Sequence, residues 1–379
     1  MGTLTEAQPQ FINAVGSTSR LLSLDVFRGM TIAAMILVND AGDWSHIYWP
    51  LEHAEWNGWT PTDLVFPFFL FIVGVSMVLS FNARRERGAS RAHLLLHSLK
   101  RSAIIFVLGL FLNGYPHFAL DTIRIPGVLQ RIAVVYLIAS VIVLFTGRVS
   151  RMVIAAALLM GYFLLMRFVP VPGHGAGVLT MDGNLAGYID RALMYNHLYI
   201  AHRFDPEGVL STIPAIVTCL IGVFAGESIR GKQPRQIVHV LLMGAAVGLT
   251  LGKVWSFWFP INKNLWSSSY TLFTAGFAMA VLAACVYLID LRGWKRWAQP
   301  FVWFGVNPLA IYFLASWLGK ASVSHSFNGL RWKNIVYGKY FAHLFASPYM
   351  NSLSYATAFV LLFWIVAWAL YRQKIFIKV

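Results

Sequence analysis

Apolar stretches of membrane-spanning length recur along the whole chain after residue 20. A helix needs about 20 apolar residues to cross the hydrocarbon core of a bilayer, and hydropathy places about ten such stretches here. They lie at residues 21–41, 62–81, 102–119, 127–146, 151–169, 209–227, 237–258, 269–290, 299–318 and 352–371. Because backbone in lipid must satisfy its own hydrogen bonds, these stretches predict helices. We therefore expect an all-α, polytopic membrane helix bundle with about ten transmembrane helices.

The composition agrees with a membrane bundle rather than a set of soluble domains. Only 12% of the 379 residues are charged, whereas soluble domains have about 25%. A polytopic bundle folds as one unit, so we expect a single transmembrane domain at residues 20–379. Residues 1–19 are polar and are expected to form a disordered tail.

The net charge of +15 could suggest a nucleic-acid-binding protein. The basic residues, however, stand in short connections between apolar stretches, where they act as topology signals. We therefore expect a lipid bilayer as partner and no nucleic acid. Both cysteines, Cys219 and Cys285, fall inside apolar stretches, so we expect buried side chains, no disulfide framework and no metal site.

Basic residues favour one set of alternate connections. With Arg20 this set holds 18 basic residues, in 82–101, 147–151, 228–236, 291–298 and the chain end after residue 371. The other set holds fewer, spread over the longer loops 42–61, 120–126, 170–208, 259–268 and 319–351. The positive-inside rule then places both termini in the cytoplasm and the connection 42–61 on the periplasmic or external side. A bacterial inner membrane is the expected location.

Two long connections are expected to contain structure of their own. Residues 170–208 hold Gly- and Pro-rich turns around a short amphipathic piece, Leu185–Leu193. Residues 319–351 have a similar pattern, which predicts a helix on the membrane surface.

The connection 42–61 concentrates groups that can take part in catalysis. It has no Lys or Arg, and its candidate residues are His46, Glu52, His53, Glu55, Trp56 and Asn57. A histidine beside acids can act as a general base near neutral pH or as an acyl-accepting nucleophile. The alternative is an interfacial histidine satisfied by its acidic neighbours. We expect His53 to be the reactive residue and His46 to be the weaker candidate.

The stretches on either side contribute polar groups of their own. Asn39 has an amide that could hydrogen-bond a substrate carbonyl. Asp63 begins the second stretch and could equally cap a helix, because the string PTD is a typical helix start. Asp25 and Arg28, three residues apart, form either an intrahelical ion pair or a seat for an anionic ligand.

Further charged residues fall at membrane depth or at the ends of stretches. Arg124 and Arg131 flank the start of the fourth stretch, and Lys253 lies inside the seventh. Charges at this depth are costly, so each is expected to bind a carboxylate of a neighbouring helix or a phosphate group.

Two pairs of polar residues stand just outside the stretches. Asp205 and Glu207 precede the sixth stretch, where they could receive a cationic amine or stabilise a helix N-terminus. Asn262 and Lys263 could line a pocket or form a polar turn.

Several strings occur here in a fixed order: SLDVFRGMTIA, HAEWNGWTPTDLVFPFFLFIVG, IRIPGVLQRIAV, GYIDR followed by HLY, DPEGVLSTIPA and FPINKNLWSSSY. Together they resemble the heparan-α-glucosaminide N-acetyltransferase family over residues 20–372. The large luminal segment that precedes the bundle in the animal enzyme, and its extra first span, are expected to be absent here.

The resemblance implies transmembrane acetyl transfer. Acetyl-CoA is the implied co-substrate, entering from the cytosolic side, and the acceptor is the amino group of an amino sugar on the far side. The family's active-site histidine matches His53, and its helix asparagine near the active site matches Asn39. A homodimer is implied by the family only.

The resulting hypothesis assigns three sets of residues. The catalytic residues are His53, as general base or transient acetyl acceptor, Asn39 and Asp63. The residues expected to bind CoA are Arg28, Arg124, Arg131, Lys253, Asn262 and Lys263. The residues expected to bind the acceptor are Glu52, Trp56, Asn57, Asp205 and Glu207. The alternative is a transporter or permease for a small anion or sugar, because charges buried in a membrane bundle suit that function equally well.

Overall fold

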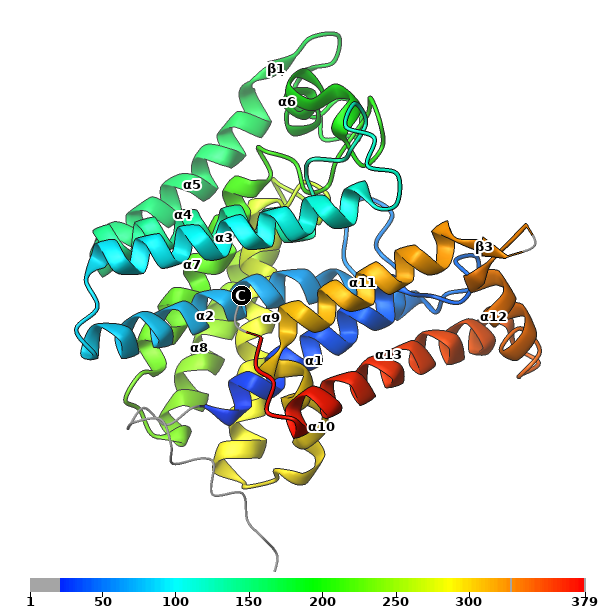
Figure 1. Ribbon diagram of the computed structural model, residues 1–379. Coiled ribbons are helices and arrows are strands. Elements are labelled where there is room, and N and C mark those ends of the chain that lie inside the picture. The colour runs from blue at the N-terminus through cyan, green and yellow to red at the C-terminus, as the bar shows by residue number, and fades with distance from the viewer. Residues whose placement is uncertain (1–20, 328, 378–379) are drawn as a thin grey trace, which may run out of the picture.

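The computed structural model describes residues 21–327 and 329–377. The tail expected at residues 1–19 lies outside the described residues. Within them, the chain forms a bundle of long helices with two short two-stranded hairpins (Figure 1). In this part, nine helices are long and apolar enough to cross a membrane, and a bent pair adds a tenth crossing if it counts as one. The expected all-α bundle of about ten transmembrane helices is confirmed.

The unbroken crossings follow one another along the chain. They are α1 (Leu22–Asn39), α2 (Val65–Glu86) with the leading 3-10 helix η3 (Pro61–Leu64), α3 (Arg91–Gly114), α4 (Val128–Phe145), α5 (Arg148–Phe168), α7 (Thr212–Ile229), α8 (Pro234–Trp255), α9 (Ser268–Cys285) with the π-helix η5 (Val286–Leu291), and α13 (Pro348–Arg372). The start of α1 and the end of α13 lie at one end of the bundle, and the α1–α2 connection lies at the other (Figure 1). We call the latter the His53 end. Which side of the membrane it faces stays a prediction.

Helix α3 begins earlier than the apolar pattern predicted. We expected a helix at 102–119 after a basic connection, but α3 begins at Arg91 and ends at Gly114. Ser90 caps its start by accepting a hydrogen bond from the backbone N–H of His93 at 3.2 Å. Hydropathy marks only the part of a helix that lies in lipid, so the polar first turns were wrongly placed in the connection.

The apolar stretch expected to cross at 299–318 is broken into two helices, which count as one crossing only if the bent pair is taken together. Helices α10 (Gln299–Val306) and α11 (Pro308–Ser324) are bent by 76°. Pro308 has no backbone N–H and disfavours helical geometry at the residue before it. The side chain of Asn307 donates to the carbonyl of Ile375 at 2.9 Å and accepts from the N–H of Ile377 at 2.8 Å, so the segment after α13 packs against the break.

Shorter elements fill the connections. They are η2 (Trp49–Leu51), the antiparallel pair β1 (Pro170–Val171) and β2 (Gly175–Ala176), α6 (Leu185–Met194), η4 (Tyr195–His197), η6 (Arg296–Ala298), the antiparallel pair β3 (Ser326–Phe327) and β4 (Leu330–Arg331), and α12 (Trp332–Tyr340). The helix expected at Leu185–Leu193 is confirmed as α6. Its N-cap is Asn184, which accepts from the N–H of Gly187 at 2.7 Å. The helix expected in 319–351 is α12, and its place on a membrane surface stays a prediction.

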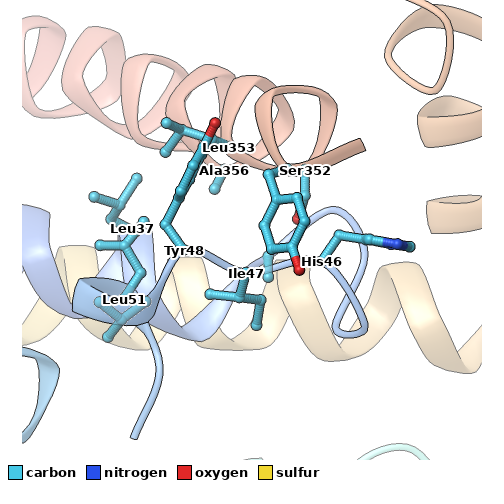
Figure 2. Close-up of a pocket in the computed structure, with 11 residues that line it drawn as sticks. Leu37, His46, Ile47, Tyr48, Leu51, Ser352, Leu353 and Ala356 are labelled. Atoms are coloured by element: carbon cyan, nitrogen blue, oxygen red, sulfur yellow. The ribbon is translucent and has the colours of Figure 1, made fainter. Parts of the chain in front are cut away.

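The first part of the α1–α2 connection is fixed to α13. Figure 2 shows Ile47, Tyr48 and Leu51 around a small apolar pocket whose other side is formed by residues of α13, among them Ala356. The backbone N–H of Asp43 donates to the hydroxyl of Ser352 at 3.0 Å. This segment is therefore held against the bundle before the chain reaches His53.

Helices α2 and α7 approach so closely that only glycine fits at their contact points. A Cβ built at Gly74 would lie 2.0 Å from the carbonyl oxygen of Cys219, and one at Gly222 would lie 2.0 Å from that of Phe71. Gly226 follows four residues after Gly222, which is the small-residue spacing of closely packed helices in membranes. Since both helices lie largely inside the bundle, this contact stabilises its centre.

Long connections at the His53 end are joined by a buried ion pair. Arg124 precedes α4 and donates through Nε and Nη2 to the two carboxylate oxygens of Asp205, at 2.8 and 2.7 Å. The Asp205 carboxylate also accepts from the backbone N–H groups of Tyr199 and Glu207. Its side chain is fully buried and that of Arg124 is 21% exposed. One carboxylate thus holds the segments before α4 and α7 together.

We predict that Gly222→Val lowers the thermal unfolding temperature of the purified protein in detergent. The added methyl groups must displace the α2 backbone, and overpacking of this kind costs about 1–3 kcal/mol or more. Gly161→Val is the matched control, because a Cβ at Gly161 on α5 meets nothing within 4 Å. Equal unfolding temperatures for the two variants would contradict the close approach of α2 and α7.

We also predict that Arg124→Gln destabilises the protein far more than Arg203→Gln. Both arginines bind an aspartate through Nε and Nη2, but the Arg203–Asp182 pair is about half exposed. Removing one partner of a buried pair leaves an uncompensated charge and costs about 3–5 kcal/mol, while exposed pairs contribute little. Thermal unfolding of the two variants checks this, and similar losses would show that the buried pair does not anchor these loops.

Candidate active site

His53 and Asp63 form a close pair at the His53 end. The Nδ1 atom of His53 lies 2.7 Å from Oδ1 of Asp63. The His53 side chain is 49% exposed, whereas that of Asp63 is 1% exposed. An ionised carboxylate only accepts hydrogen bonds, so Nδ1 carries the proton and Nε2 of the neutral ring keeps its lone pair. A buried acid therefore orients a half-exposed imidazole, as in a nucleophile or base that is positioned by a third group.

The start of the second crossing creates this geometry. Thr60 is the N-cap of η3, and Asp63 is the third residue of a capping box, with Oδ2 accepting from the backbone N–H of Thr60 at 3.0 Å. The same oxygen accepts from the N–H of Ala54 at 3.0 Å, and the Thr60 hydroxyl donates to the carbonyl of Glu52 at 2.5 Å. Asp63 therefore stabilises the start of the helix and also orients His53. It does so from the third helical position, because the N-cap is Thr60.

The acid beside His53 differs from the expected neighbours. Glu52 and Glu55 are both exposed, and among the described residues neither forms a hydrogen bond or ion pair with the His53 side chain. His46 belongs to a different group, because its Nδ1 lies 2.7 Å from Oδ2 of Asp43. The folding back of residues 52–60 over η3, rather than sequence proximity, decides which acid reaches the ring.

Lys263 comes from the α8–α9 connection and lies against the same ring. Its Nζ is 3.0 Å from both Nδ1 and Nε2 of His53 and 3.7 Å from Oδ1 of Asp63. Burial lowers the pKa of the Lys263 amine, although the charges of Asp63 and Glu207 oppose the shift. The residue that was expected to bind CoA is therefore a neighbour of the candidate catalytic pair.

Hydrogen bonds fix the α8–α9 connection beside the loop that carries His53. The N–H of Gly58 donates to the carbonyl of Ile261 at 2.8 Å, and the Asn262 amide donates to the Asn57 side chain at 3.2 Å. The Asn262 side chain also accepts from the N–H of Leu265 at 2.8 Å. Asn57 and Asn262 therefore hold two loops together, whatever else they contact.

Trp56 is anchored to the long connection before α6. Its Nε1 donates to the carbonyl of Leu179 at 2.8 Å, and its ring meets that of Phe204 at a centroid distance of 5.4 Å. The loop that carries His53 is therefore bounded by segments from three other parts of the chain.

Glu207 stands next to the buried ion pair. Its Oε2 accepts from Nη2 of Arg124 at 2.5 Å, whereas Oε1 has no hydrogen-bond partner within the described part of the chain. Burial alone would raise the pKa of Glu207, but the charges of Arg124, Arg131 and Lys263 lower it overall. Asp205, in contrast, uses both oxygens on Arg124 and backbone N–H groups.

Arg131 is a fully buried cation on α4. It donates to the Ser211 hydroxyl at 2.5 Å and to the carbonyl of Gly208 at 3.1 Å, and its guanidinium lies 5.1 Å from the centre of the Trp266 ring. In residues 21–327 and 329–377 it has no carboxylate within ion-pair distance, and Nε and Nη1 have no hydrogen-bond partner. Of the two partners expected for Arg131, a carboxylate of a neighbouring helix is therefore not found among the described residues, and a phosphate group stays a prediction.

Three other candidate residues form no hydrogen bond or ion pair with this cluster within the part of the chain that the structure describes. Arg28 binds Asp25 at 3.0 Å, which confirms the expected intrahelical pair, and also donates to the Ser76 hydroxyl at 2.7 Å. Lys253 is exposed on the last turn of α8. Asn39 is exposed at the His53 end of α1, about 16 Å along the helix from Arg28 at about 1.5 Å per residue. Its side chain makes no hydrogen bond among the described residues.

The sequence analysis missed two groups near the site. Thr60 could have been found, because T-x-x-D before an apolar run resembles a capping box. Asp40 directly follows Asn39, and burial raises its pKa to about 7 against the opposing charge of Lys333. The charges of Glu207 and Asp40 also act on Tyr312 of α11.

The site has the chemistry of a positioned base or nucleophile. In the described ranges no three His, Cys, Asp or Glu side chains are grouped so as to hold a metal ion. The reactive groups are one imidazole, one buried carboxylate and one amine.

The chain is similar to known acetyltransferases over most of its length. Residues 20–253, which include His53 and Asp63, match the family described as heparan-alpha-glucosaminide N-acetyltransferase, catalytic. The heparan-alpha-glucosaminide N-acetyltransferase of Mus musculus is 32% identical over 96% of this chain and 61% of its own length. That of Homo sapiens is 32% identical over 99% of this chain and 62% of its own length.

The chain thus spans about three fifths of the length of these curated relatives. The family match covers more than half of the chain and begins where the bundle begins. This protein belongs to the heparan-alpha-glucosaminide N-acetyltransferase family.

Proposed function

We propose that this chain is a transmembrane acetyltransferase that moves the acetyl group of acetyl-CoA to the amino group of an amino sugar. Membership of the family supports acetyl transfer. The observation that carries the proposal is the 2.7 Å contact between the half-exposed His53 ring and the buried Asp63 carboxylate.

Two routes use the same atom of His53. In the direct route, Nε2 takes a proton from the amine as its nitrogen attacks the thioester carbon; the C–S bond then breaks and the CoA sulfur leaves with a proton. In the covalent route, Nε2 attacks first, CoA leaves, and the amine then takes the acetyl group from the ring. Asp63 stabilises the positive charge that the ring acquires in either case. Parallel initial-rate lines would support the covalent route, and intersecting lines would support the direct one.

We assign roles to the surrounding polar side chains from the atoms that are exposed or that make no hydrogen bond in the described part of the chain. Asn39 offers an exposed amide at the same end of the bundle, and we assign it to the oxyanion of the tetrahedral intermediate. One carboxylate oxygen of Glu207 has no hydrogen-bond partner among residues 21–327 and 329–377, which suits the ammonium group of an acceptor. Both carboxylate oxygens of Asp205 already accept hydrogen bonds, so its role in this scheme is to hold Arg124. Glu52, Trp56 and Asn57 surround His53 on its own loop and complete the proposed acceptor site.

The two substrates would reach the site from opposite ends of the bundle. Basic connections cluster at the end away from His53, which supports a cytoplasmic position for that end and a periplasmic one for His53 in a bacterial inner membrane. Positive charge there attracts the phosphates of CoA, and Arg28 lies in that half of α1. Arg124, Arg131, Lys253, Asn262 and Lys263 are not at that end, so any contact they make with CoA would involve its acetyl-bearing arm.

We predict that His53→Ala lowers acetyl transfer from labelled acetyl-CoA to glucosamine by about 10²–10⁴-fold, the usual contribution of a general base. The assay uses the purified chain in proteoliposomes. His46→Ala is the matched control, because His46 lies on the same loop but pairs with Asp43. Equal transfer by His53→Ala and the parent would move the chemistry elsewhere. Sugar flux without CoA would favour the transporter, for which the broken α10–α11 pair is a second supporting feature beside the buried charges.

We predict that Asp63→Asn lowers the same activity by a comparable factor while acetyl-CoA binding persists. The amide can donate a hydrogen bond to Nδ1, which would favour the tautomer with its proton on Nε2 and so block the reactive atom. Asp43→Asn, beside His46, is the control. Thermal unfolding of both variants shows whether the bundle is intact, and full activity of a folded Asp63→Asn variant would contradict the orienting role.

A further inference from the structure

Lys263 lies over the face of the His53 ring rather than at its edge. Its Nζ is equally distant, at 3.0 Å, from the two ring nitrogens. A point in the ring plane at that distance from both would overlap the ring carbons, so the amine must lie out of the plane. The lone pair of Nε2 lies in the plane. Lys263 therefore leaves the reactive direction of the ring open.

The position of this amine is set by the protein. The side chain of Lys263 is only 18% exposed. Its neighbour Asn262 is bonded to Asn57 and to the N–H of Leu265. A cation held this close to an imidazole, away from bulk water, acts on it much more strongly than a solvated surface lysine would.

Lys263 and a protonated His53 would compete for one carboxylate. Asp63 Oδ1 is 2.7 Å from His53 Nδ1 and 3.7 Å from Lys263 Nζ. A buried carboxylate alone would draw a second proton onto the ring, and an imidazolium can neither take a proton from an amine nor attack a thioester. A nearby positive charge opposes that protonation.

We propose that Lys263 is a positioning residue that keeps the His53 ring neutral, with Nε2 free, until the acceptor amine arrives. The benefit of a neutral ring depends on the proposed acetyl transfer. The effect of the Lys263 charge on the protonation of the ring does not depend on that function. The other charges that face this pair are Glu207 and Arg131, which act on Lys263 from two further segments. Glu52 and Glu55 on the loop of His53 are exposed and hence screened by solvent.

The test measures the protonation of His53 directly. Diethylpyrocarbonate modifies neutral imidazole, and mass spectrometry of the peptide that contains His53 gives the modification rate as a function of pH. In Lys263→Met, which removes the charge but keeps the chain length, we expect the midpoint to move to higher pH by about one to three units. Lys263→Arg should restore it. Lys320→Met is the control, because Lys320 lies on α11 and donates to the carbonyl of Leu112.

Acetyl transfer supplies the second readout. The acidic limb of kcat/KM should move to higher pH by the same amount in Lys263→Met. A folded Lys263→Met variant whose modification midpoint does not move would overturn the proposal, whatever its activity. A moved midpoint in a chain that transfers no acetyl group would support the effect of Lys263 on the ring and refute the proposed function instead.

Discussion

The buried carboxylate of Asp63 is the group on which the His53 end depends. An isolated charge at this depth is costly, so both of its oxygens need partners. Backbone N–H groups of Ala54 and Thr60 satisfy one oxygen, and the His53 ring satisfies the other. Because the same bonds begin η3 and fold the preceding residues over it, the start of the second crossing and the orientation of the imidazole have one cause.

Lys263, Arg124 and Arg131 are each stabilised in a different way. Arg124 has two acidic partners, whereas Lys263 shares Asp63 with His53. Arg131 has no acidic partner within ion-pair distance in the described residues; it is stabilised by a hydroxyl, a carbonyl and the face of Trp266. The three cations are matched in number by three acids, Asp63, Asp205 and Glu207, and Arg131 is the cation that no acid binds directly in this part of the chain.

The crossings could be predicted from the sequence because lipid imposes a local requirement on every stretch of about 20 residues. The partners of reactive groups could not. Glu52 and Glu55 are neighbours of His53 in sequence, yet both point to solvent, while Asp63 reaches the ring because a capping turn reverses the chain. Likewise, the contact with Lys263 joins residues 210 positions apart. Only tertiary packing creates such pairs.

The break between α10 and α11 is stabilised by side chains and backbone groups from other parts of the chain. Broken helices at membrane depth are tolerated only where protein or a polar cavity satisfies the freed backbone. Here Arg28 donates to the carbonyl of Gly305, and Asn307 binds the segment after α13. Beyond the break, the charge of Glu207 acts on Tyr312 of α11. Because α11 begins directly after the break, and a Cβ at Gly319 further along it would lie 2.4 Å from Oδ1 of Asp40, this helix connects the break with the residue that follows Asn39 at the end of α1.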